Sequence, residues 1–494
     1  MAYYIGYDLG SSSVKAALVD ASSGQSIGIT NYPENEMKII SLETGWAEQQ
    51  PELWWKNIIK VTEKLLTETG VNSSQIKGVG IAYQMHGLVT VDKDHNVLRP
   101  SIIWCDSRAV NIGNQAFLEV GKEKCISHLL NSPGNFTLSK LKWVKENEPE
   151  VYSKIYKFLL PGDFISLKLT GKPTTTISGL SEGIMWDFKE NKPAEWLFEH
   201  FGISTDLIPE IVPTFSNQGL VNKEAAKEIG LPEGIPVLYR SGDQPNNALS
   251  LNVLNPGEIA ATGGTSGVVY ALTDRTDSKE SIRINSFAHV NYTKEKPVIG
   301  KLLNINGAGI QYSWMKSQLA SSSSYNDINE LAARVPVGSD GLRIIPFGNG
   351  AERMLENANN GSSIFNLNFN KHQSQHLFRA ALEGIAFAFV YGINILKEDG
   401  VEVSRIRAGN DNLFRSEIFS KTIATLTDAK IDIMDSTGAV GAARAAGVAN
   451  KDFETLESAF SENEKVLTYY PLTDKQQYKE AYDSWVQYLE NRYK

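Results

Sequence analysis

The sequence contains few cysteines, no long apolar run and no block of like charge. Its two cysteines, Cys105 and Cys125, are too few for a disulfide framework or for a zinc site built on cysteines. The net charge of −9 is spread along the chain, so a nucleic acid is not an expected partner. No apolar run approaches the ~18 residues of a membrane span, and no signal peptide is visible. These absences favour a soluble cytoplasmic enzyme.

The chain of 494 residues is long enough for two or three domains, and 41% apolar residues supply folded interiors. Strand patterns at residues 3–7, 14–19 and 76–82 are mixed with a helical pattern at 51–66, which predicts an α/β architecture. A second strand–turn–strand unit follows at 258–272, about half a chain later. This spacing predicts duplicated lobes, which we divide into residues 1–242 and 243–494.

Each predicted lobe opens with a turn of small residues. The first is Asp-Leu-Gly-Ser-Ser-Ser at 8–13, and the second is Gly-Gly-Thr-Ser-Gly at 263–267. Backbone N–H groups and hydroxyls in such turns can bind phosphate oxygens, and Asp8 can hold a magnesium ion through water. An ordinary hairpin turn is the alternative for each turn taken alone. No Walker-type loop is present, because Gly171-Lys172 is followed by Pro173.

Two further clusters follow strand-like runs. Asp243 would lie at a strand end near the lobe boundary, where a carboxylate can accept the proton of a hydroxyl that attacks a phosphate. Gln-Met-His-Gly at 84–87 and Trp-Cys-Asp-Ser-Arg at 104–108 combine an aromatic face with donors and acceptors, which suits a polyhydroxylated ligand. The alternatives are an Asx turn or helix cap at Asp243, and a buried tryptophan, a surface Asp–Arg pair and a turn histidine in the other cluster.

Together these motifs resemble the FGGY carbohydrate kinases, and the xylulokinase branch in particular. The resembling segments span most of the chain, in the order 4–15, 45–51, 84–87, 104–108, 135–144, 242–244, 257–267 and 380–386. The Met-His-Gly segment followed by Trp-x-Asp-x-Arg points to the xylulokinase branch. Residues 346–355 depart from the Ser-Gly-Glu-Arg-Thr-Pro-like run usual in the family, and Gly-Asn-Asp-Asn at 409–412 replaces the Gly-Gly pair expected near the adenine.

The resemblance implies two actin-like (ribonuclease-H-like) lobes that close on ATP with Mg²⁺ and on a sugar. It implies that Asp243 is the general base and that Asp8 organises the metal. On the sugar side it implies Met85, His86, Trp104, Asp106, Arg108 and Gln244. The nucleotide contacts that it implies are Gly10, Ser11, Ser12, Lys15, Gly264, Thr265, Ser266, Gly309, Gly409 and Asn410.

The expected function is ATP-dependent phosphorylation of a ketose, with D-xylulose converted to D-xylulose 5-phosphate as the leading case. The same chemistry on another ketose, a polyol or gluconate is one alternative, because a fold does not fix its substrate. A non-catalytic actin-fold sugar sensor is another, and the presence of Asp8 and Asp243 weighs against it. The expected partners are a sugar and ATP. A homodimer stays open, since sequence identifies no interface.

Overall fold

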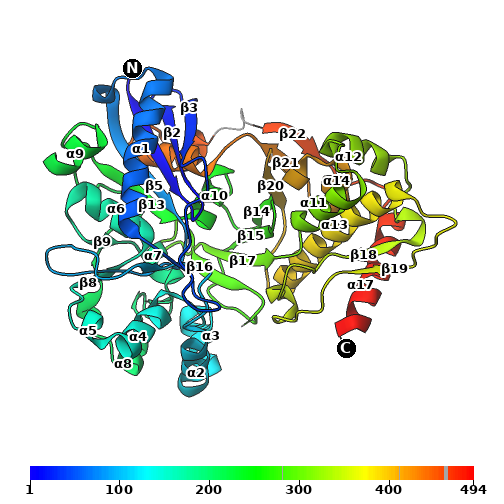
Figure 1. The fold of residues 1–494 in the computed structure, drawn as a ribbon, viewed down its shortest axis with the longest axis horizontal. Helices are drawn as coiled ribbons and strands as arrows, with labels where there is room; N and C mark the ends of the chain where they lie inside the picture. Colours follow the sequence, from blue (N-terminus) through cyan, green and yellow to red (C-terminus); the bar gives the residue numbers. More distant parts are fainter. Residues whose placement is uncertain (281, 411, 461–464, 494) are drawn as a thin grey trace.

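The protein has two halves, each built on its own β-sheet (Figure 1). The computed structural model describes residues 1–280, 282–410, 412–460 and 465–493. Sheets and helices occur throughout both halves, which confirms the predicted α/β class. The first predicted hairpin and helix are confirmed as β1 (Tyr3–Leu9), β2 (Val14–Asp20) and α1 (Pro51–Thr69).

The sheet of the N-terminal half has the strand order β13-β5-β1-β2-β3. Strand β5 pairs in parallel with both β1 and β13, whereas β2 and β3 extend from the central strand β1 as an antiparallel meander. The remaining bounds are β3 (Ser26–Tyr32), β5 (Ile76–Tyr83) and β13 (Val237–Gly242). Because β1, β5 and β13 run in one direction, the residues that follow them meet at a single edge of the sheet.

The two faces of this sheet are covered by segments that lie far apart in the sequence. Ile5 and Tyr7 point to a core shared with α1, α6 (Pro161–Thr170) and α9 (Lys223–Ile229). Tyr4 points to the opposite face, where it packs against α15 (Gly438–Ala449). A helix near the end of the chain therefore completes the N-terminal half.

Two glycines permit this close contact between α15 and the sheet. A Cβ atom on Gly6 would lie 2.0 Å from the carbonyl oxygen of Ala439, and one on Gly80 would lie 1.9 Å from that of Ala442. Real Cβ atoms do not approach oxygen so closely, so any side chain at either position would push the helix away. The alanines of α15 serve the same purpose from the other side of the contact.

The sheet of the C-terminal half has the order β16-β17-β15-β14-β20-β21-β22. The second predicted strand–turn–strand unit is confirmed as β14 (Glu258–Gly263) and β15 (Gly267–Thr273), which pair antiparallel. The other bounds are β16 (Asn285–Ala288), β17 (Ile299–Ile305), β20 (Arg405–Gly409), β21 (Ile431–Met434) and β22 (Lys465–Tyr469).

A long helix, α13 (Ser374–Glu398), forms the centre of the C-terminal core. It is long and apolar enough to cross a membrane by length and composition, but 83% of its apolar window is buried inside the protein, as in a core helix. Around it lie α11 (Gly309–Leu319), α12 (Tyr325–Ala333), α14 (Glu417–Thr427), α17 (Gln476–Tyr493), β18 (Arg343–Ile345) and β19 (Ser363–Phe365).

The region between β5 and β13 forms a helical extension of the N-terminal half, seen at the lower left in Figure 1. Its helices are α2 (Val110–Val120), α3 (Lys122–Leu129), α4 (Thr137–Asn147), α5 (Pro149–Tyr152), α7 (Ile177–Glu182) and α8 (Glu195–Phe201). Short strands lie between them: β6 (Val89–Val91), β7 (Ser101–Ile102), β8 (Lys157–Leu159), β9 (Thr174–Thr175), β10 (Trp186–Asp187), β11 (Lys192–Pro193) and β12 (Glu210–Ile211). Strand β4 (Glu48–Gln49) precedes α1 in the sequence and pairs antiparallel with β7. Among the described residues, the two remaining α-helices are α10 (Asp243–Ser250) and α16 (Leu456–Ala459).

Candidate active site

Two carboxylates lie at the shared edge of β1, β5 and β13. Asp8 belongs to the end of β1, and Asp243 is the first residue of α10, directly after β13. Asp8 is level with Ala82 of β5, and Gly242 is level with Tyr83, the next residue of the same strand. With strands about 4.8 Å apart, the backbones of the two aspartates are separated by roughly 10 Å across β5.

Burial changes the acidity of both carboxyl groups. It raises the pKa of Asp8 above its usual range, although the ammonium group of Lys15 acts in the opposite direction. Burial also raises the pKa of Asp243 to about 7, and the negative charge of Asp8 adds to the effect. A carboxylate that titrates near neutral pH can both accept and release a proton under physiological conditions.

The N-terminus of α15 approaches Asp8. A Cβ atom on Gly438, the first residue of the helix, would lie 2.6 Å from the Oδ2 atom of Asp8. The carbonyl of Gly438 accepts a hydrogen bond of 2.9 Å from the Nδ2 atom of Asn246, on the helix that Asp243 begins. The positive end of a helix dipole favours the ionised form of a nearby carboxylate.

The first predicted phosphate turn is held by hydrogen bonds on both sides. The amide of Gly10 donates to the carbonyl of Ser13 at 3.0 Å, which closes the turn. The carbonyl of Ser11 accepts from the Nε2 atom of Gln49 at 2.7 Å, and that of Ser12 accepts from the amide of Met37 at 2.8 Å. Ser12 and Lys15 are exposed.

The second predicted turn lines a cavity of about 430 Å³ in the C-terminal half. Gly264 and Thr265 lie in its wall, and their carbonyls accept hydrogen bonds of 3.0 Å from the amides of Gly309 and Ile310 at the start of α11. A Cβ atom on Gly309 would lie 2.3 Å from the oxygen of Gly264, so only glycine allows this contact. Further around the cavity are Tyr312, Ser313, Tyr325, Asn326, Asn329, Leu382, Leu413, Arg415 and Ser416.

This cavity includes only part of the predicted nucleotide set. Gly309 lines it together with the turn, whereas Ser266, Gly409 and Asn410 are outside its wall. Gly409 ends β20, and the amide of Asn410 donates to the carbonyl of Met434 at 2.8 Å. The segment Gly-Asn-Asp-Asn at 409–412, which replaces the expected Gly-Gly pair, includes Asp411, which lies outside the described residues.

On the predicted sugar side, His86 adopts a left-handed backbone conformation, with φ of 62°. Its Nδ1 atom lies 2.9 Å from the carbonyl oxygen of Glu182. A carbonyl only accepts, so Nδ1 carries the proton and Nε2 is left as an acceptor. Burial lowers the pKa of His86 to about 3, which keeps the ring neutral. Its neighbour Met85 is buried.

Asp106 and Arg108 lie in a buried ion-pair network. The Nη2 atom of Arg108 is 2.7 Å from the Oδ2 atom of Asp106, and its Nη1 atom is 2.7 Å from Glu48. The guanidinium also lies 3.9 Å from the ring centre of Trp46 and 4.8 Å from that of Trp143. Such a pair braces the loop, and a direct contact of either side chain with a sugar stays a prediction.

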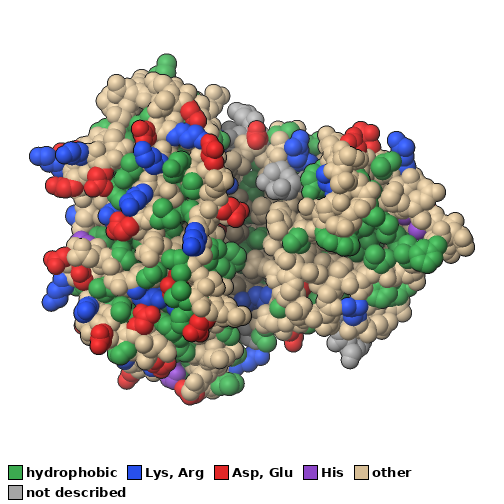
Figure 2. All heavy atoms as spheres, viewed as in Figure 1, with side chains coloured by type: hydrophobic (Ala, Val, Ile, Leu, Met, Phe, Trp, Pro, Cys, Tyr) green, Lys and Arg blue, Asp and Glu red, His purple; other side chains and the backbone are tan. Residues whose placement is uncertain are grey.

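Trp104 differs from its neighbours because 52% of it is exposed. Its indole Nε1 atom donates to the hydroxyl of Ser11 at 3.4 Å, a long hydrogen bond. The predicted sugar segment therefore contacts the first phosphate turn. The space-filling view shows a deep groove between the two halves of the protein (Figure 2).

The sequence matches the N-terminal domain of the FGGY family of carbohydrate kinases over residues 3–250, and the C-terminal domain of that family over residues 259–450. The chain belongs to the FGGY carbohydrate kinases. It is therefore an enzyme that phosphorylates a sugar with ATP as the phosphate donor. The lobe boundary predicted between residues 242 and 243 stays a prediction.

Two relatives of this FGGY kinase match along almost its whole length. It is 28% identical to the xylulose kinase of Bacillus subtilis over 98% of its own chain and 96% of that protein. It is also 28% identical to a protein of Haemophilus influenzae named "Probable L-xylulose kinase", over 99% of its chain and 98% of that protein. Among solved structures, the xylulose kinase of Rhodospirillum rubrum superposes with a TM-score of 0.88 at 25% identity, covering 99% and 98% of the two chains. The actin-like two-lobe fold is thus shared.

Two residues of this region had no assigned role in the sequence. Glu182 is buried at the end of α7, and its Oε2 atom lies 3.0 Å from the position of a Cβ atom on Gly242. Burial raises its pKa well above the usual range. Lys140 of α4 is completely buried and bonds to two backbone carbonyls. Glutamate and lysine side chains usually lie at the surface, so the sequence gives no sign that either residue is buried near the site.

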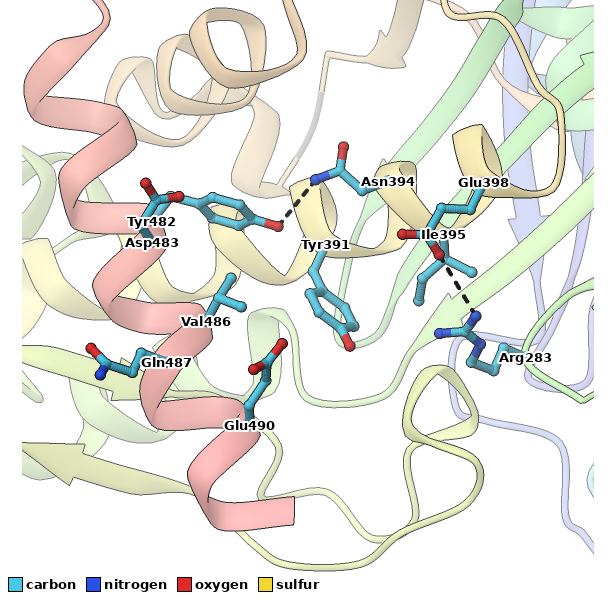
Figure 3. A pocket seen from close by; sticks show the side chains of 10 residues that line it. All are labelled: Arg283, Tyr391, Asn394, Ile395, Glu398, Tyr482, Asp483, Val486, Gln487 and Glu490. Carbon is cyan, nitrogen blue, oxygen red and sulfur yellow. Dashed lines mark hydrogen bonds and ion pairs between the residues drawn. The ribbon is translucent and has the colours of Figure 1, made fainter. Parts of the chain in front are cut away.

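A second cavity, of about 490 Å³, lies between α13 and α17 and contains none of the predicted residues (Figure 3). The hydroxyl of Tyr482 accepts a hydrogen bond of 3.2 Å from Asn394 there, and Arg283 lies 3.9 Å from Glu398. All of its lining residues belong to the C-terminal half, and none lies on β1, β5 or β13, so we treat it as separate from the candidate active site.

Proposed function

We propose that this FGGY kinase transfers the γ-phosphate of ATP to the terminal hydroxyl of a ketose, with D-xylulose as the substrate and D-xylulose 5-phosphate as the product. The relatives named xylulose kinase support the substrate. The Met85–His86 segment supports it too, because a neutral histidine with a free Nε2 acceptor can receive a hydrogen bond from a sugar hydroxyl.

The acidity of Asp243 is the observation that carries this proposal. A general base works best when its pKa lies near the working pH, and burial together with Asp8 raises the pKa of Asp243 to about 7. In the reaction, the C5 hydroxyl loses its proton to Asp243 while its oxygen forms a bond to the γ-phosphorus. The bond between that phosphorus and the β,γ-bridging oxygen breaks, and ADP leaves.

The phosphate turns would stabilise the charge that spreads over the transferring group. Ser11 and Ser12 offer backbone N–H groups and hydroxyls in one half, where the hydrogen bond from Gly10 to Ser13 closes the turn, and Gly264, Thr265 and Ser266 offer them in the other. The cavity beside Gly309 has the volume of a small-molecule site and mixes apolar and amide side chains, as a nucleoside requires.

Asp8 fits the requirement for a metal-organising carboxylate. Mg²⁺ keeps most of its waters and binds through one or two carboxylates together with substrate phosphates. Among the residues that the structure describes, no group of three or more acidic, histidine or cysteine side chains could hold a metal alone. The oxygen of Asp8 would thus hold the ion through water, where it would neutralise phosphate charge.

A coupled assay of ADP release tests the substrate and the chemistry. The panel is D-xylulose, L-xylulose, D-ribulose, glycerol and gluconate. We expect the highest kcat/KM for D-xylulose, and faster turnover of another acceptor would transfer the assignment to that acceptor. ADP release that depends on no sugar would contradict the proposal and favour a sensor.

A pair of variants tests the base. Replacing Asp243 by Ala should lower kcat by roughly 10²–10⁴-fold and leave sugar binding measurable by calorimetry. Asp206 is exposed and belongs to none of the strands that form the sheet edge. Asp206→Ala is therefore the matched control and should keep wild-type kcat. A near-wild-type kcat for Asp243→Ala would remove Asp243 from the mechanism.

L-Xylulose, the mirror image of D-xylulose, is the second candidate substrate. It is favoured by the equal identity of the chain to the two relatives, one of which carries an L-xylulose name. The two sugars are mirror images that differ at both C3 and C4, so the ratio of their kcat/KM values decides between them.

A further inference from the structure

Three segments that are distant in the sequence meet at the side chain of Lys140. Its Nζ atom donates to the carbonyl of His86 at 2.8 Å and to the carbonyl of Ile103 at 2.9 Å. His86 belongs to the loop after β5, and Ile103 immediately precedes Trp104. One ammonium group thus joins the two segments that the proposed function assigns to the sugar.

The chemistry of this contact is unusual for a lysine. Lys140 is completely buried, and across the described ranges no carboxylate lies within ion-pair distance of its Nζ atom. Lysine is almost never fully buried unless it is paired, because loss of hydration is costly. Burial accordingly lowers the pKa of Lys140 to about 7. A hydrophobic residue would fill the same space at lower cost, so the two carbonyl bonds are the feature that the lysine alone supplies.

His86 is the residue that most needs such support. A left-handed backbone is unfavourable for a non-glycine residue and persists only where surrounding contacts impose it. Lys140 fixes the carbonyl of His86, and Phe136, just before α4, packs edge-on against its ring at 4.9 Å. The beginning of α4 therefore sets both the backbone and the ring of His86.

We propose that Lys140 is a positioning residue of the sugar site, which holds the His86 loop and the Trp104 loop at a fixed separation through their backbone carbonyls. The proposal rests on the proposed function, since it takes these two loops as the sugar-binding segments. Lys140 is completely buried, so it acts through the two loops that it holds. Its effect is therefore on sugar affinity, while the cavity beside Gly309, lined by residues of the C-terminal half alone, should keep its shape.

The test is Lys140→Met, which retains the length of the side chain and removes all three donors. Its matched control is Lys145→Met on the same helix, because Lys145 also donates to a backbone carbonyl, that of Gly202. The sugar is the one that the wild-type enzyme phosphorylates fastest. We expect Lys140→Met to raise the KM for this sugar about tenfold or more and to leave the KM for ATP unchanged. Lys145→Met should leave both values unchanged.

Lys140→Gln provides a second variant, because its amide keeps two donors on a shorter, neutral side chain. It should give a sugar KM between those of the wild type and Lys140→Met. An unchanged sugar KM in folded Lys140→Met, an equal rise in both KM values, or failure of both variants to fold would overturn the positioning role. If wild-type enzyme phosphorylates no sugar, the proposed function fails and this role fails with it. If wild-type is active and only the Lys140 result is negative, the proposed function stands.

Discussion

Asp8 lies near the end of β1 and Asp243 directly follows β13, the two strands that flank β5, so their carboxyl groups share one sheet edge although 235 positions of sequence separate them (243 − 8). After burial, the negative charge of Asp8 is a further cause of the raised pKa of Asp243. The N-terminus of α15 stands beside Asp8 and favours its ionised form. The proposed base and the proposed metal-organising carboxylate thus lie at one edge of one sheet, beside the start of a helix from near the other end of the chain.

Replacing Asp243 by Asn should stabilise the protein at pH 8. Native Asp243 has a pKa of about 7, above its ordinary value of 3.8, so between these values the native state holds a proton that the unfolded state has lost. Its contribution to stability is therefore largest below pH 3.8 and is lost as the pH rises to 7. We expect Asp243→Asn to exceed the wild type by roughly 2 kcal/mol at pH 8, with a smaller difference at pH 5. Urea unfolding at both pH values measures this, and a difference independent of pH would contradict it.

The ionisation of Asp243 should also make the activity fall at acidic pH, which gives the rate profile an acid limb. Asp243 accepts a proton only when it is ionised, so kcat/KM for the sugar should fall as the pH drops below the pKa of about 7. A bound cation nearby moves the midpoint to lower pH, because positive charge favours the carboxylate. A rate profile from pH 5 to 8 at fixed Mg²⁺ measures the limb. Activity that rises on acidification would exclude Asp243 as the base.

Gly80→Ala should separate α15 from the N-terminal sheet. The added Cβ atom would lie 1.9 Å from the carbonyl oxygen of Ala442, and neither backbone can move without disturbing the sheet or the helix. We expect a loss of about 3 kcal/mol in the free energy of unfolding. Gly70→Ala is the control, because a Cβ atom there meets open space and only its φ of 68° is unfavourable, at about 1 kcal/mol. Equal losses in the two variants would show that the helix does not need the contact.

The hairpins and the edge residues could be predicted from sequence because their signals are local. Alternating apolar residues identify β1 and β2, and an aspartate that follows such a strand must lie at the sheet edge. The position of α15 could not be predicted, because nothing in its run of alanines identifies β1, more than 400 positions earlier, as its partner.

The roles of buried charged residues were also beyond local signals. Asp106 and Arg108 have the side chains of a sugar site, but the structure pairs them with each other and with Glu48 in the interior. In the sequence, Lys140 looks like a lysine at the surface of a helix. Only its hydrogen bonds to the carbonyls of His86 and Ile103 in the folded protein distinguish it from one. Such roles depend on tertiary contacts, which a single sequence does not encode in any short pattern.

Gly309→Ala should weaken nucleotide binding selectively. A Cβ atom would lie 2.3 Å from the carbonyl oxygen of Gly264, so α11 and the phosphate turn would have to move apart. We expect the KM for ATP to rise by at least about tenfold, since small displacements of a phosphate site are costly. The KM for the sugar serves as the internal control and should not change. A change in the KM for the sugar alone would contradict the assignment of this turn to the nucleotide.

Trp104→Ala should weaken sugar binding without destabilising the fold. Trp104 is 52% exposed and joins the sugar segment to the turn at Ser11, so its ring is free to stack on a sugar face. We expect a rise of roughly threefold to tenfold in the sugar KM with an unchanged urea midpoint. Trp314→Ala is the control, because that tryptophan is 61% exposed and lies on α11 in the other half. If both variants leave the sugar KM unchanged, the exposed indole of Trp104 serves only its hydrogen bond to Ser11, and the sugar site must lie deeper, against His86.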